Sequence, residues 1–385
     1  MDLTYTPEQA AYREGVQRFV ERVLTPLVND KYDFTNPLTR QDVANLRADV
    51  AGHEIATTAP LDEQDRLDLI CLGIFIEEIS KLNVGLASLA TAVFFPVWDL
   101  GSMLKGSQKE TYGHLFAPGE LVSMGMSEPN AGSHMAGLQT TARREGEGWI
   151  LRGRKLWISH AQIAAGVIVA ARNTESGLIS LFIVDAARQK YEVRPIKTMG
   201  FTSTSICEVS FDDCLLPADA ELTPGKGGLR TALGFIEQAR IKMIFMAVGL
   251  AQASLDLAVE YAKIRTQFGR PIGAFQLVQG LLADMAIETE AARMLGYRVA
   301  SQFMAGEDCR KTVSIAKAYA TEASVRITSW GIQVHGAMGL TAECAAERYF
   351  RDARMLTIPD GTTEIHKLTI GRELTGLDAF GAVRN

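Results

Sequence analysis

The chain has 385 residues, of which 47% are hydrophobic and 22% charged, so it has enough apolar material for a large core and is not an intrinsically disordered sequence. At roughly 150 residues per domain, this length predicts two or three packed domains. The net charge of −6 argues against a nucleic-acid-binding protein, although a local group of basic side chains could still hold a phosphate.

The cysteines and the N-terminus both indicate a cytoplasmic protein. The five cysteines are odd in number and no two are spaced C-x-x-C, a pattern typical of reduced thiols and not of a zinc site. The first 14 residues contain neither the basic nor the apolar region of a signal peptide. The longest apolar run, at 243–250, is too short to span a bilayer, so no membrane span is predicted.

Residues 1–120 have a helical pattern. Thr6, Pro7 and Gln9 form a capping-box sequence, with Thr6 as the N-cap residue and proline at the first helical position. Apolar residues then recur at helical spacing. Further helices are predicted to begin near Arg40 and to cover about 65–82 and 85–104.

The hydrophobic period changes toward two between about 121 and 225. Short runs rich in β-branched residues are separated there by Gly, Asp, Asn and Pro, which predicts an antiparallel sheet or barrel. The runs that carry this prediction are at 149–158, 166–170, 179–184 and 206–211.

Helical spacing returns after the glycine-rich cluster 224–228, which lacks the spacing of a phosphate-binding loop and is interpreted as a solvated hinge. The order of helices, strands and helices disfavours a doubly wound α/β fold, in which strands and helices alternate. The long amphipathic segments of this last region are at about 229–265, 273–304, 310–336 and 362–375.

Several common catalytic motifs are absent from the sequence. There is no G-x-G-x-x-G nucleotide fingerprint and no G-x-S-x-G nucleophile elbow. The six histidines show no H-E-x-x-H or other metal-ligand spacing. An enzyme with this sequence therefore needs another source of reactivity, which points to an organic cofactor.

A set of motifs occurs in a fixed order along the chain. The middle region contains GMSEPNAGSH at 125–134 and KLWIS at 155–159. The last region contains RTQFGRPI at 265–272, QVHG at 333–336, RYFRDAR at 348–354 and DGTTEI at 360–365. In this order and at these separations, the chain resembles the acyl-CoA dehydrogenase family of flavoenzymes from about residue 4 to about residue 376.

This resemblance implies an α+β multidomain fold. The expected domains are an N-terminal α-helical domain at 1–120, a middle antiparallel β-barrel domain at 121–225, and a C-terminal four-helix bundle domain at 226–385. The resemblance also implies an FAD cofactor, an acyl thioester substrate carried by CoA or by an acyl carrier protein, an electron-transfer flavoprotein as electron acceptor, and a homotetramer assembled through the C-terminal bundles.

The resemblance places the flavin ring against the two middle-region motifs. Ser127 would hydrogen-bond the pyrimidine side of the ring, Trp157 would pack against it, and Ser159 would lie near N5, the atom that accepts hydride. An apolar indole face suits a flat ring, and small hydroxyl residues make polar contacts without crowding it. The cofactor-binding residues implied here are Met124, Met126, Ser127, Ser133, Trp157, Ile158 and Ser159.

Other positions match family residues around the diphosphate, the adenosine and the substrate. The family's contacts to the FAD of a neighbouring subunit fall on Arg265, Phe268, Phe275 and Gln276, and the forked guanidinium of arginine suits a diphosphate. The segments along the adenosine half contain Gln333, Val334, Gly336, Ala337, Thr362 and Glu364. The residues implied for the thioester and its carrier are Ser133, Glu237, Arg240 and Gly361.

Taken without the resemblance, these residues allow plainer interpretations. Trp157 could be a core aromatic of the β region, and Ser127 and Ser133 could be ordinary turn residues. Arg265 could be a solvated helix charge. Glu237 could simply be the i,i+3 partner of Arg240 on one helix.

The family's catalytic base is most often the glutamate of a Tyr-Glu-Gly-Thr segment, which reads Pro-Asp-Gly-Thr at 359–362 here. The resemblance therefore implies Asp360 as the base that removes the α-proton while hydride leaves for flavin N5. Aspartate is shorter by one methylene, about 1.5 Å, which favours a closer, bulkier or branched substrate. The family's second position for the base is Ala239 here, which has no carboxylate, and Asp360 could instead be a turn or helix N-cap residue.

Three further departures from the family pattern lie around the substrate. His134 replaces the usual aspartate of its motif, Ala337 replaces a glycine, and residues 52–64 lack a Pro-x-x-x-Gly-Gly segment. They indicate a retained flavin site and a changed substrate side, which favours an unusual short or branched acyl group in specialised metabolism. Two alternatives stay open: a flavin oxidase of the nitroalkane oxidase type, which resembles this family and uses aspartate as its base, and a flavin-binding scaffold without catalysis.

Overall fold

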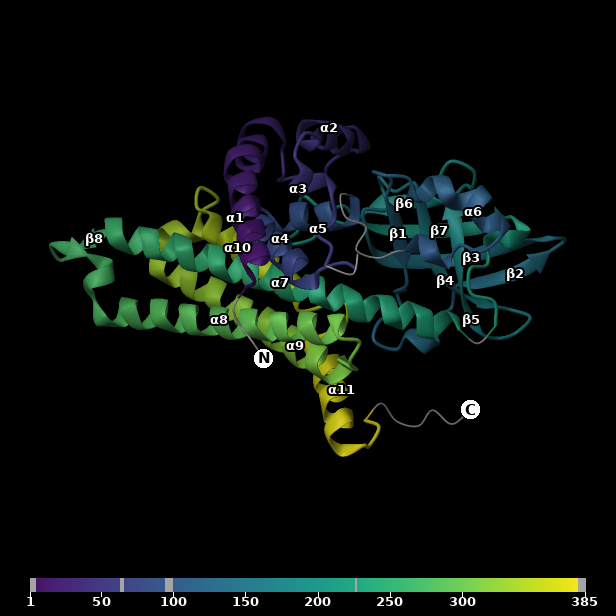
Figure 1. Cartoon of the computed structure of the whole chain (residues 1–385). Helices are drawn as coiled ribbons and strands as arrows, with labels where there is room; N and C mark the ends of the chain where they lie inside the picture. Colours follow the sequence, from purple (N-terminus) through teal and green to yellow (C-terminus); the bar gives the residue numbers. More distant parts are fainter. Residues whose placement is uncertain (1–4, 63–65, 94–99, 226, 380–385) are drawn as a thin grey trace.

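The computed structural model describes residues 5–62, 66–93, 100–225 and 227–379, and the structural statements below concern these residues. The chain forms an N-terminal group of helices, a middle β-sheet and a C-terminal group of long helices, in that order (Figure 1). The sheet lies at one end of the molecule, and the long helix α7 runs from beside it through the helical part (Figure 1).

The N-terminal helices begin where capping side chains are available. The predicted capping box is confirmed: the Thr6 hydroxyl accepts the backbone N–H of Gln9, and Gln9 Oε1 accepts the N–H of Thr6, both at 3.2 Å. The predicted helix start near Arg40 is confirmed, and the helix predicted over about 65–82 begins at Leu69, where the Asp68 carboxylate caps two N–H groups of the first turn. The helices are α1 (Pro7–Phe19), α2 (Arg40–Val50), α3 (Glu54–Thr57), α4 (Leu69–Leu82), α5 (Val84–Val93) and α6 (Ser107–Tyr112).

The helix predicted at 85–104 is shorter in the structure. α5 ends at Val93, and Leu100–Met103 forms a turn of 3-10 helix, while residues 94–99 lie outside the described residues. Nearly every side chain of α5 is buried, and the helix packs against α4 and α7. α5 therefore belongs to the core that joins the N-terminal helices to the C-terminal ones.

The middle region is one seven-stranded sheet whose central strand, β4, pairs differently from the prediction. β1 and β2 follow one another along one side of β4 and both run parallel to it, whereas β5 pairs antiparallel along the other side. β4 and β5 are buried almost throughout, and parallel pairing occurs mainly in strands that are covered on both faces. The strands are β1 (Val122–Gly125), β2 (Thr141–Glu145), β3 (Gly148–Ser159), β4 (Gly166–Asn173), β5 (Ile179–Asp185), β6 (Glu192–Pro195) and β7 (Ile206–Leu216).

The prediction of an antiparallel sheet is thus wrong for the β1–β4 and β2–β4 pairs, which are parallel. It holds for the β2–β3, β3–β7, β4–β5 and β6–β7 pairs. β1, β2 and β6 are not apparent in the sequence pattern because each has only four or five residues. β6 also lies at the edge of the sheet with mostly exposed side chains, so it carries no apolar alternation.

The C-terminal region is built on three long helices near the predicted positions. The shorter α10, which the sequence pattern does not predict, packs against α7 and α9 and makes the fourth helix of the bundle. α7 begins directly at the end of the glycine-rich cluster, of which residue 226 lies outside the described residues. The elements are α7 (Gly228–Ile264), β8 (Thr266–Gln267), β9 (Arg270–Pro271), α8 (Gln276–Met304), α9 (Arg310–His335), α10 (Ala345–Leu356) and α11 (Thr363–Thr375).

α7 is the one described helix that is long and apolar enough to cross a membrane by composition, with a mean hydropathy of 1.5 over its most apolar window. Two thirds of that window (67%) is buried inside the protein. α7 packs against α4, α8, α9 and α10, and a helix that is covered on all sides is apolar on all sides. Its composition is therefore that of the core helix of the bundle.

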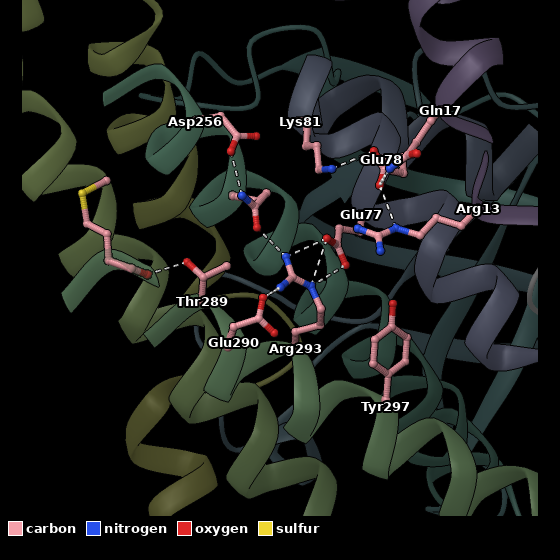
Figure 2. A network of polar contacts seen from close by, with 12 residues as sticks. Arg13, Gln17, Glu77, Glu78, Lys81, Asp256, Thr289, Glu290, Arg293 and Tyr297 are labelled. Carbon is pink, nitrogen blue, oxygen red and sulfur yellow. Dashed lines mark hydrogen bonds and ion pairs between the residues drawn. The ribbon is translucent and has the colours of Figure 1, made fainter. Parts of the chain in front are cut away.

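A buried polar network ties the N-terminal helices to the bundle (Figure 2). The guanidinium of Arg293 on α8 donates to Glu77 Oε1 on α4 at 2.9 Å and to Gln252 Oε1 on α7 at 2.6 Å. The Arg293 and Glu77 side chains are 7% and 3% exposed. Because both charges are desolvated and paired, the contact fixes how the two groups of helices sit on one another.

Candidate active site between the sheet and the helices

The turn that carries Asp360 is held by two basic side chains. It joins α10 to α11, with φ angles of 56° at Asp360 and 103° at Gly361. Arg240 Nε on α7 donates to the carbonyl oxygen of Asp360 at 2.9 Å, and Lys317 Nζ on α9 donates to that of Gly361 at 2.7 Å. A left-handed conformation at a non-glycine residue costs energy and persists only where the surroundings hold it. These two donors therefore hold the backbone of the turn at Asp360 and Gly361.

Asp360 is not the N-cap of the following helix. That position belongs to Thr362, whose hydroxyl accepts the backbone N–H of Ile365 at 3.4 Å. The capping interpretation of Asp360 is therefore wrong, and its carboxylate makes no hydrogen bond with any described residue.

Three cations act on the Asp360 carboxylate. Burial raises its pKa, and the charges of Lys242, Lys317 and Arg240 oppose that rise by favouring the carboxylate. Burial in turn lowers the pKa of Lys317, which is fully buried, to about 8. None of the lysines is in a sequence motif named above, and the signal that could have found Lys242 is a single charge inside the apolar run of α7.

Two buried histidines complete this polar surface. His160 follows β3 directly, lies 3.4 Å (Nε2 to Oγ) from Ser88 of α5, and has a pKa lowered to about 3 by burial and by the charge of Lys242. His366 on α11 is fully buried, and neither ring nitrogen has a hydrogen-bond partner among the described residues. Burial and two nearby cations lower its pKa to about 3 as well. Both imidazoles are therefore neutral at pH 7.

Trp157 is exposed on the sheet, not buried in it. β3 contains two tryptophans, of which Trp149 is 2% exposed and Trp157 is 58% exposed. A register shift between Lys155 and Ile158 interrupts the pairing of β3 with β7, and Trp157 has a φ of 66° there. A bulge re-aims the side chain at its position. The interpretation of Trp157 as a core aromatic is therefore wrong, and its indole offers a flat apolar face.

A buried ion pair locks the loop 124–134 against the strand of Trp157. Lys155 Nζ donates to Glu128 Oε1 at 2.7 Å and to the carbonyl of Met126 at 3.1 Å. Glu128 also accepts the backbone N–H groups of Gln139 and Thr140. The motif-based reasoning did not single out Lys155 and Glu128, although both lie inside the two middle-region motifs.

The remaining middle-region positions flank this locked loop. Met124 lies in β1, Ile158 is a buried residue of β3, and the side chains of Ser133 and Ser159 are exposed. The carbonyl of Ser127 accepts the backbone N–H of Leu156 at 2.9 Å. The structure thus brings Ser127 beside the end of β3 that carries Trp157 and Ser159.

Most of the other predicted cofactor residues, but not Thr362 and Glu364 beside the Asp360 turn, lie at the opposite end of the bundle. Arg265, Phe268, Phe275 and Gln276 belong to or adjoin the hairpin of β8 and β9, far from the sheet (Figure 1). α7 alone separates the two ends by about 55 Å at 1.5 Å per residue. Gln333, Val334, Gly336 and Ala337 lie at this far end too, because His335 stacks on Tyr261 of α7 with ring centroids 4.4 Å apart. Within one chain, these residues therefore lie far from Trp157.

The substrate-side positions lie on α7 and beside the Asp360 turn. Glu237 and Arg240 are both half-buried, and no ion pair or hydrogen bond joins them among the described residues. The simple i,i+3 pairing of these two residues is therefore wrong. Glu364 is exposed in the first turn of α11. The described residues contain no cluster of His, Cys, Asp or Glu that could hold a metal ion.

Comparisons with known proteins agree over the whole chain. Residues 123–214 match the middle domain of acyl-CoA dehydrogenases, and residues 226–375 match the C-terminal domain. The probable acyl-CoA dehydrogenase YngJ of Bacillus subtilis is 33% identical over 97% of this chain and 100% of its own. Glutaryl-CoA dehydrogenase from Mycobacterium smegmatis has a TM-score of 0.87 with 30% identity, covering 98% of this chain and 97% of that chain. A structure described as the electron transferring flavoprotein of Acidaminococcus fermentans has a TM-score of 0.86 with 28% identity, covering 97% and 100%.

The fold, a helical region followed by a β half-barrel and a helical bundle, and these similarities define a flavoprotein oxidoreductase. The chain belongs to the acyl-CoA dehydrogenase family. Its cofactor is FAD, and a second M. smegmatis glutaryl-CoA dehydrogenase structure, 24% identical with a TM-score of 0.86, is a complex with FADH2. The exposed indole of Trp157 and the serine hydroxyls around it fit a flat, polar-edged ring.

Proposed function

We propose that this acyl-CoA dehydrogenase uses Asp360 as its catalytic base on the α-proton of an acyl thioester. The observation that carries the proposal is the Asp360 carboxylate, which stands on a turn of left-handed backbone, has no hydrogen bond to a described residue, and is acted on by three cations. A base must be deprotonated at the working pH, and the cations maintain that state against burial. FAD, when bound, supplies the acceptor of the hydride that leaves the β-carbon.

The chain's other residues orient the substrate around that base. Arg240 donates its Nε–H to the carbonyl oxygen of Asp360. The other N–H groups of its guanidinium can then bind a phosphate of the acyl carrier. Glu237, Ser133 and Gly361 are assigned to the thioester side, on either a CoA or an acyl carrier protein. Because aspartate reaches less far than glutamate by about 1.5 Å, the acyl group is expected to be short or branched, as in specialised metabolism.

The flavin ring is assigned to Met124, Met126, Ser127, Ser133, Trp157, Ile158 and Ser159. The hairpin residues at the far end are assigned to the FAD of a neighbouring subunit, and the adenosine half to the end of α9 and the start of α11. Support comes from apolar side chains open to solvent beside the hairpin: Phe268 is 93% exposed and Leu277 is 87% exposed. Such a patch is typical of a subunit interface, and the proposed assembly is a homotetramer.

The proposed electron acceptor is an electron-transfer flavoprotein, and the proposed compartment is the cytoplasm, where the five unpaired thiols would stay reduced. The proposed domain limits are 1–120, 121–225 and 226–385. The relatives named above are acyl-CoA dehydrogenases, which disfavours the flavin-oxidase and scaffold alternatives.

The test is an anaerobic flavin-bleaching screen of the purified holoenzyme against short, branched and straight-chain acyl thioesters on CoA and on carrier protein. We expect Asp360→Ala to retain FAD and to lose bleaching by at least 1,000-fold, and Asp360→Glu to recover part of the rate on longer chains. Unchanged bleaching in Asp360→Ala would refute the base assignment. Hydrogen peroxide release with nitroalkanes, and no bleaching by any thioester, would favour an oxidase instead.

A further inference from the structure

The irregular part of β3 is tied to the loop that joins β1 to β2. Between Lys155 and Ile158 the register of β3 against β7 shifts, and the two residues in between have no registered partner in β7. At this shift the backbone N–H of Leu156 donates to the carbonyl oxygen of Ser127 in the loop, at 2.9 Å. The strand is therefore joined to the loop at the residue directly before Trp157.

A buried ion pair lies at the same point. Lys155 Nζ donates to Glu128 Oε1 at 2.7 Å and to the carbonyl oxygen of Met126 at 3.1 Å. The side chains of Lys155 and Glu128 are 0% and 4% exposed. Burial lowers the pKa of Lys155 to about 8, and Glu128 opposes that shift, so the ammonium group remains protonated at pH 7. One buried lysine therefore holds the loop at the residues on both sides of Ser127.

Glu128 extends this contact to the segment before β2. Its carboxylate accepts the backbone N–H groups of Gln139 and Thr140, at 2.6 and 2.9 Å. Its backbone exchanges two hydrogen bonds with Ala131 across the loop, at 2.9 and 3.2 Å. An apolar residue in place of Glu128 would leave the two N–H groups without this acceptor, which is costly where they are buried. The pair therefore joins three segments, and two of them carry residues assigned to the flavin ring.

The loop also fits closely around the lysine. A Cβ at Gly125 would lie 3.3 Å from Lys155 Cγ, so any larger residue there would press on the side chain of the lysine. The ion pair of Arg152 with Asp213, by contrast, joins β3 to β7 on the surface, where the two side chains are 64% and 52% exposed. Exposed pairs contribute little, whereas the buried pair sits between the loop 124–134 and the end of β3.

We propose that Lys155 and Glu128 are positioning residues for FAD, which hold the loop 124–134 and the end of β3 at a fixed separation as the two walls of the flavin-ring site. This inference rests on the proposed function, because it takes the ring to lie against Trp157 and that loop. Lys155 and Glu128 are assigned no contact with the flavin. They act through the backbone at Met126 and through the strand that carries Trp157, and a site is precise only where such supporting contacts fix it.

The test measures FAD release and folding stability separately. Release is followed by the rise of flavin fluorescence when the holoenzyme is diluted, and thermal unfolding is measured in excess FAD. Lys155→Met alone leaves a buried carboxylate unpaired, so it should lower stability and speed release. In the double variant Lys155→Met/Glu128→Gln no charge is left unpaired. We expect its stability to recover toward that of the wild type, while FAD release stays about 10-fold faster than in the wild type.

The matched control is Arg152→Met, which breaks the exposed pair on the same strand and should release FAD at the wild-type rate. Wild-type release in the double variant, or faster release without any recovery of stability, would overturn the positioning role. If the double variant does not fold, Gly125→Ala presses on the lysine without removing a charge and should release FAD about 3-fold faster; wild-type release there would likewise count against the role.

Trp157→Leu separates this inference from the proposed function. We expect it to release FAD faster than the wild type, because it removes the flat apolar face assigned to the ring. Unchanged release in Trp157→Leu would overturn the placement of the ring itself. The release assay needs no substrate, so a failure of the thioester screen would contradict the proposed dehydrogenation and leave the positioning role standing.

Discussion

Arg240 Nε donates a hydrogen bond of 2.9 Å to the backbone carbonyl of Asp360, 120 residues further along the chain. The contact joins α7, the core helix of the bundle, to the turn before α11. It therefore fixes the position of the proposed base relative to α7. Lysine in place of arginine can reach this carbonyl or a substrate phosphate, but it lacks the fork that serves both.

We therefore expect Arg240→Lys to lower kcat/KM for the best thioester by about 10- to 100-fold, which corresponds to about 1.4–2.8 kcal/mol at 1.4 kcal/mol per tenfold. The FAD content should not change. Arg230→Lys, an exposed position on the same helix, is the matched control and should have wild-type kinetics. Equal kinetics in the two variants would show that the Arg240 contact has no catalytic consequence.

The pH dependence of flavin bleaching should follow Asp360. Burial raises the pKa of this carboxyl, and only the deprotonated form accepts the α-proton, so the bleaching rate should rise with pH through that raised pKa. Lys242 is the largest of the charges that lower the pKa of Asp360. Its removal in Lys242→Met should shift the acidic limb of the profile to higher pH, as measured by stopped-flow bleaching with one substrate. A shift to lower pH, or none, would contradict this electrostatic coupling.

Asp352 on α10 should make stability depend on pH. Its carboxylate accepts the backbone N–H of Phe201 at 2.7 Å, and burial raises its pKa from 3.8 to about 6. Between these two values the unfolded chain loses its proton before the folded one, so this group's contribution to stability falls as the pH rises toward 6. Asp352→Asn keeps an acceptor for Phe201 without ionising.

We expect Asp352→Asn to be more stable than the wild type above pH 6, by an amount on the order of 2–3 kcal/mol, and to lose this advantage near pH 4. Denaturant unfolding of the holoenzyme at pH 4.5 and pH 8 measures the difference. An advantage that is equal at both pH values would mean that Asp352 is not the titrating group.

The pair of Arg293 and Glu77 (Figure 2) should be stabilising only as a pair. Glu77→Leu alone leaves a buried guanidinium with reduced compensation, and we expect the free energy of unfolding to fall by about 3–5 kcal/mol. Adding Arg293→Met removes the second charge and should restore most of that loss. Thermal unfolding of the two single variants and the double variant measures the coupling, and simple additivity would argue against it.

Gly249 lies where α7 closely approaches α4. A Cβ at this position would lie 2.5 Å from the Glu77 carbonyl oxygen and 2.6 Å from Ser80 Cβ. Gly249→Ala should therefore destabilise the protein by about 1–3 kcal/mol through overpacking. Gly234, on the same helix, is exposed with no atom within 4 Å of such a Cβ, and Gly234→Ala should stabilise by about 0.5–1 kcal/mol. The same sign of change in both variants, measured by denaturant unfolding, would contradict the close-approach interpretation.

The chain's local patterns determined the succession of helices, strands and helices. The Thr6 cap and the long helical periods of the bundle depend on neighbours three or four residues away, and such contacts are readable in a sequence. The order and separation of the motifs were also sufficient for the family, FAD and the type of oxidoreductase.

Only the tertiary structure decided which face each strand residue takes. Trp149 and Trp157 are eight residues apart on β3, so regular alternation would put both on the same face. The irregularities in the pairing of β3 with β7 break that alternation and turn Trp157 to the outside. A short interruption of strand pairing leaves no periodic pattern in the sequence. The parallel pairing of β4 with β1 and β2 leaves no such pattern either, so the sequence did not predict it.

The charges around Asp360 likewise came together only on folding. Arg240 and Lys242 come from α7 and Lys317 comes from α9, and their charges act on Asp360 because these helices pack together beside the turn that follows α10. Electrostatic interactions depend on separation in space and on burial, neither of which is written in local sequence. The motifs therefore predicted the base, whereas only packing brought Lys242 close enough to act on it.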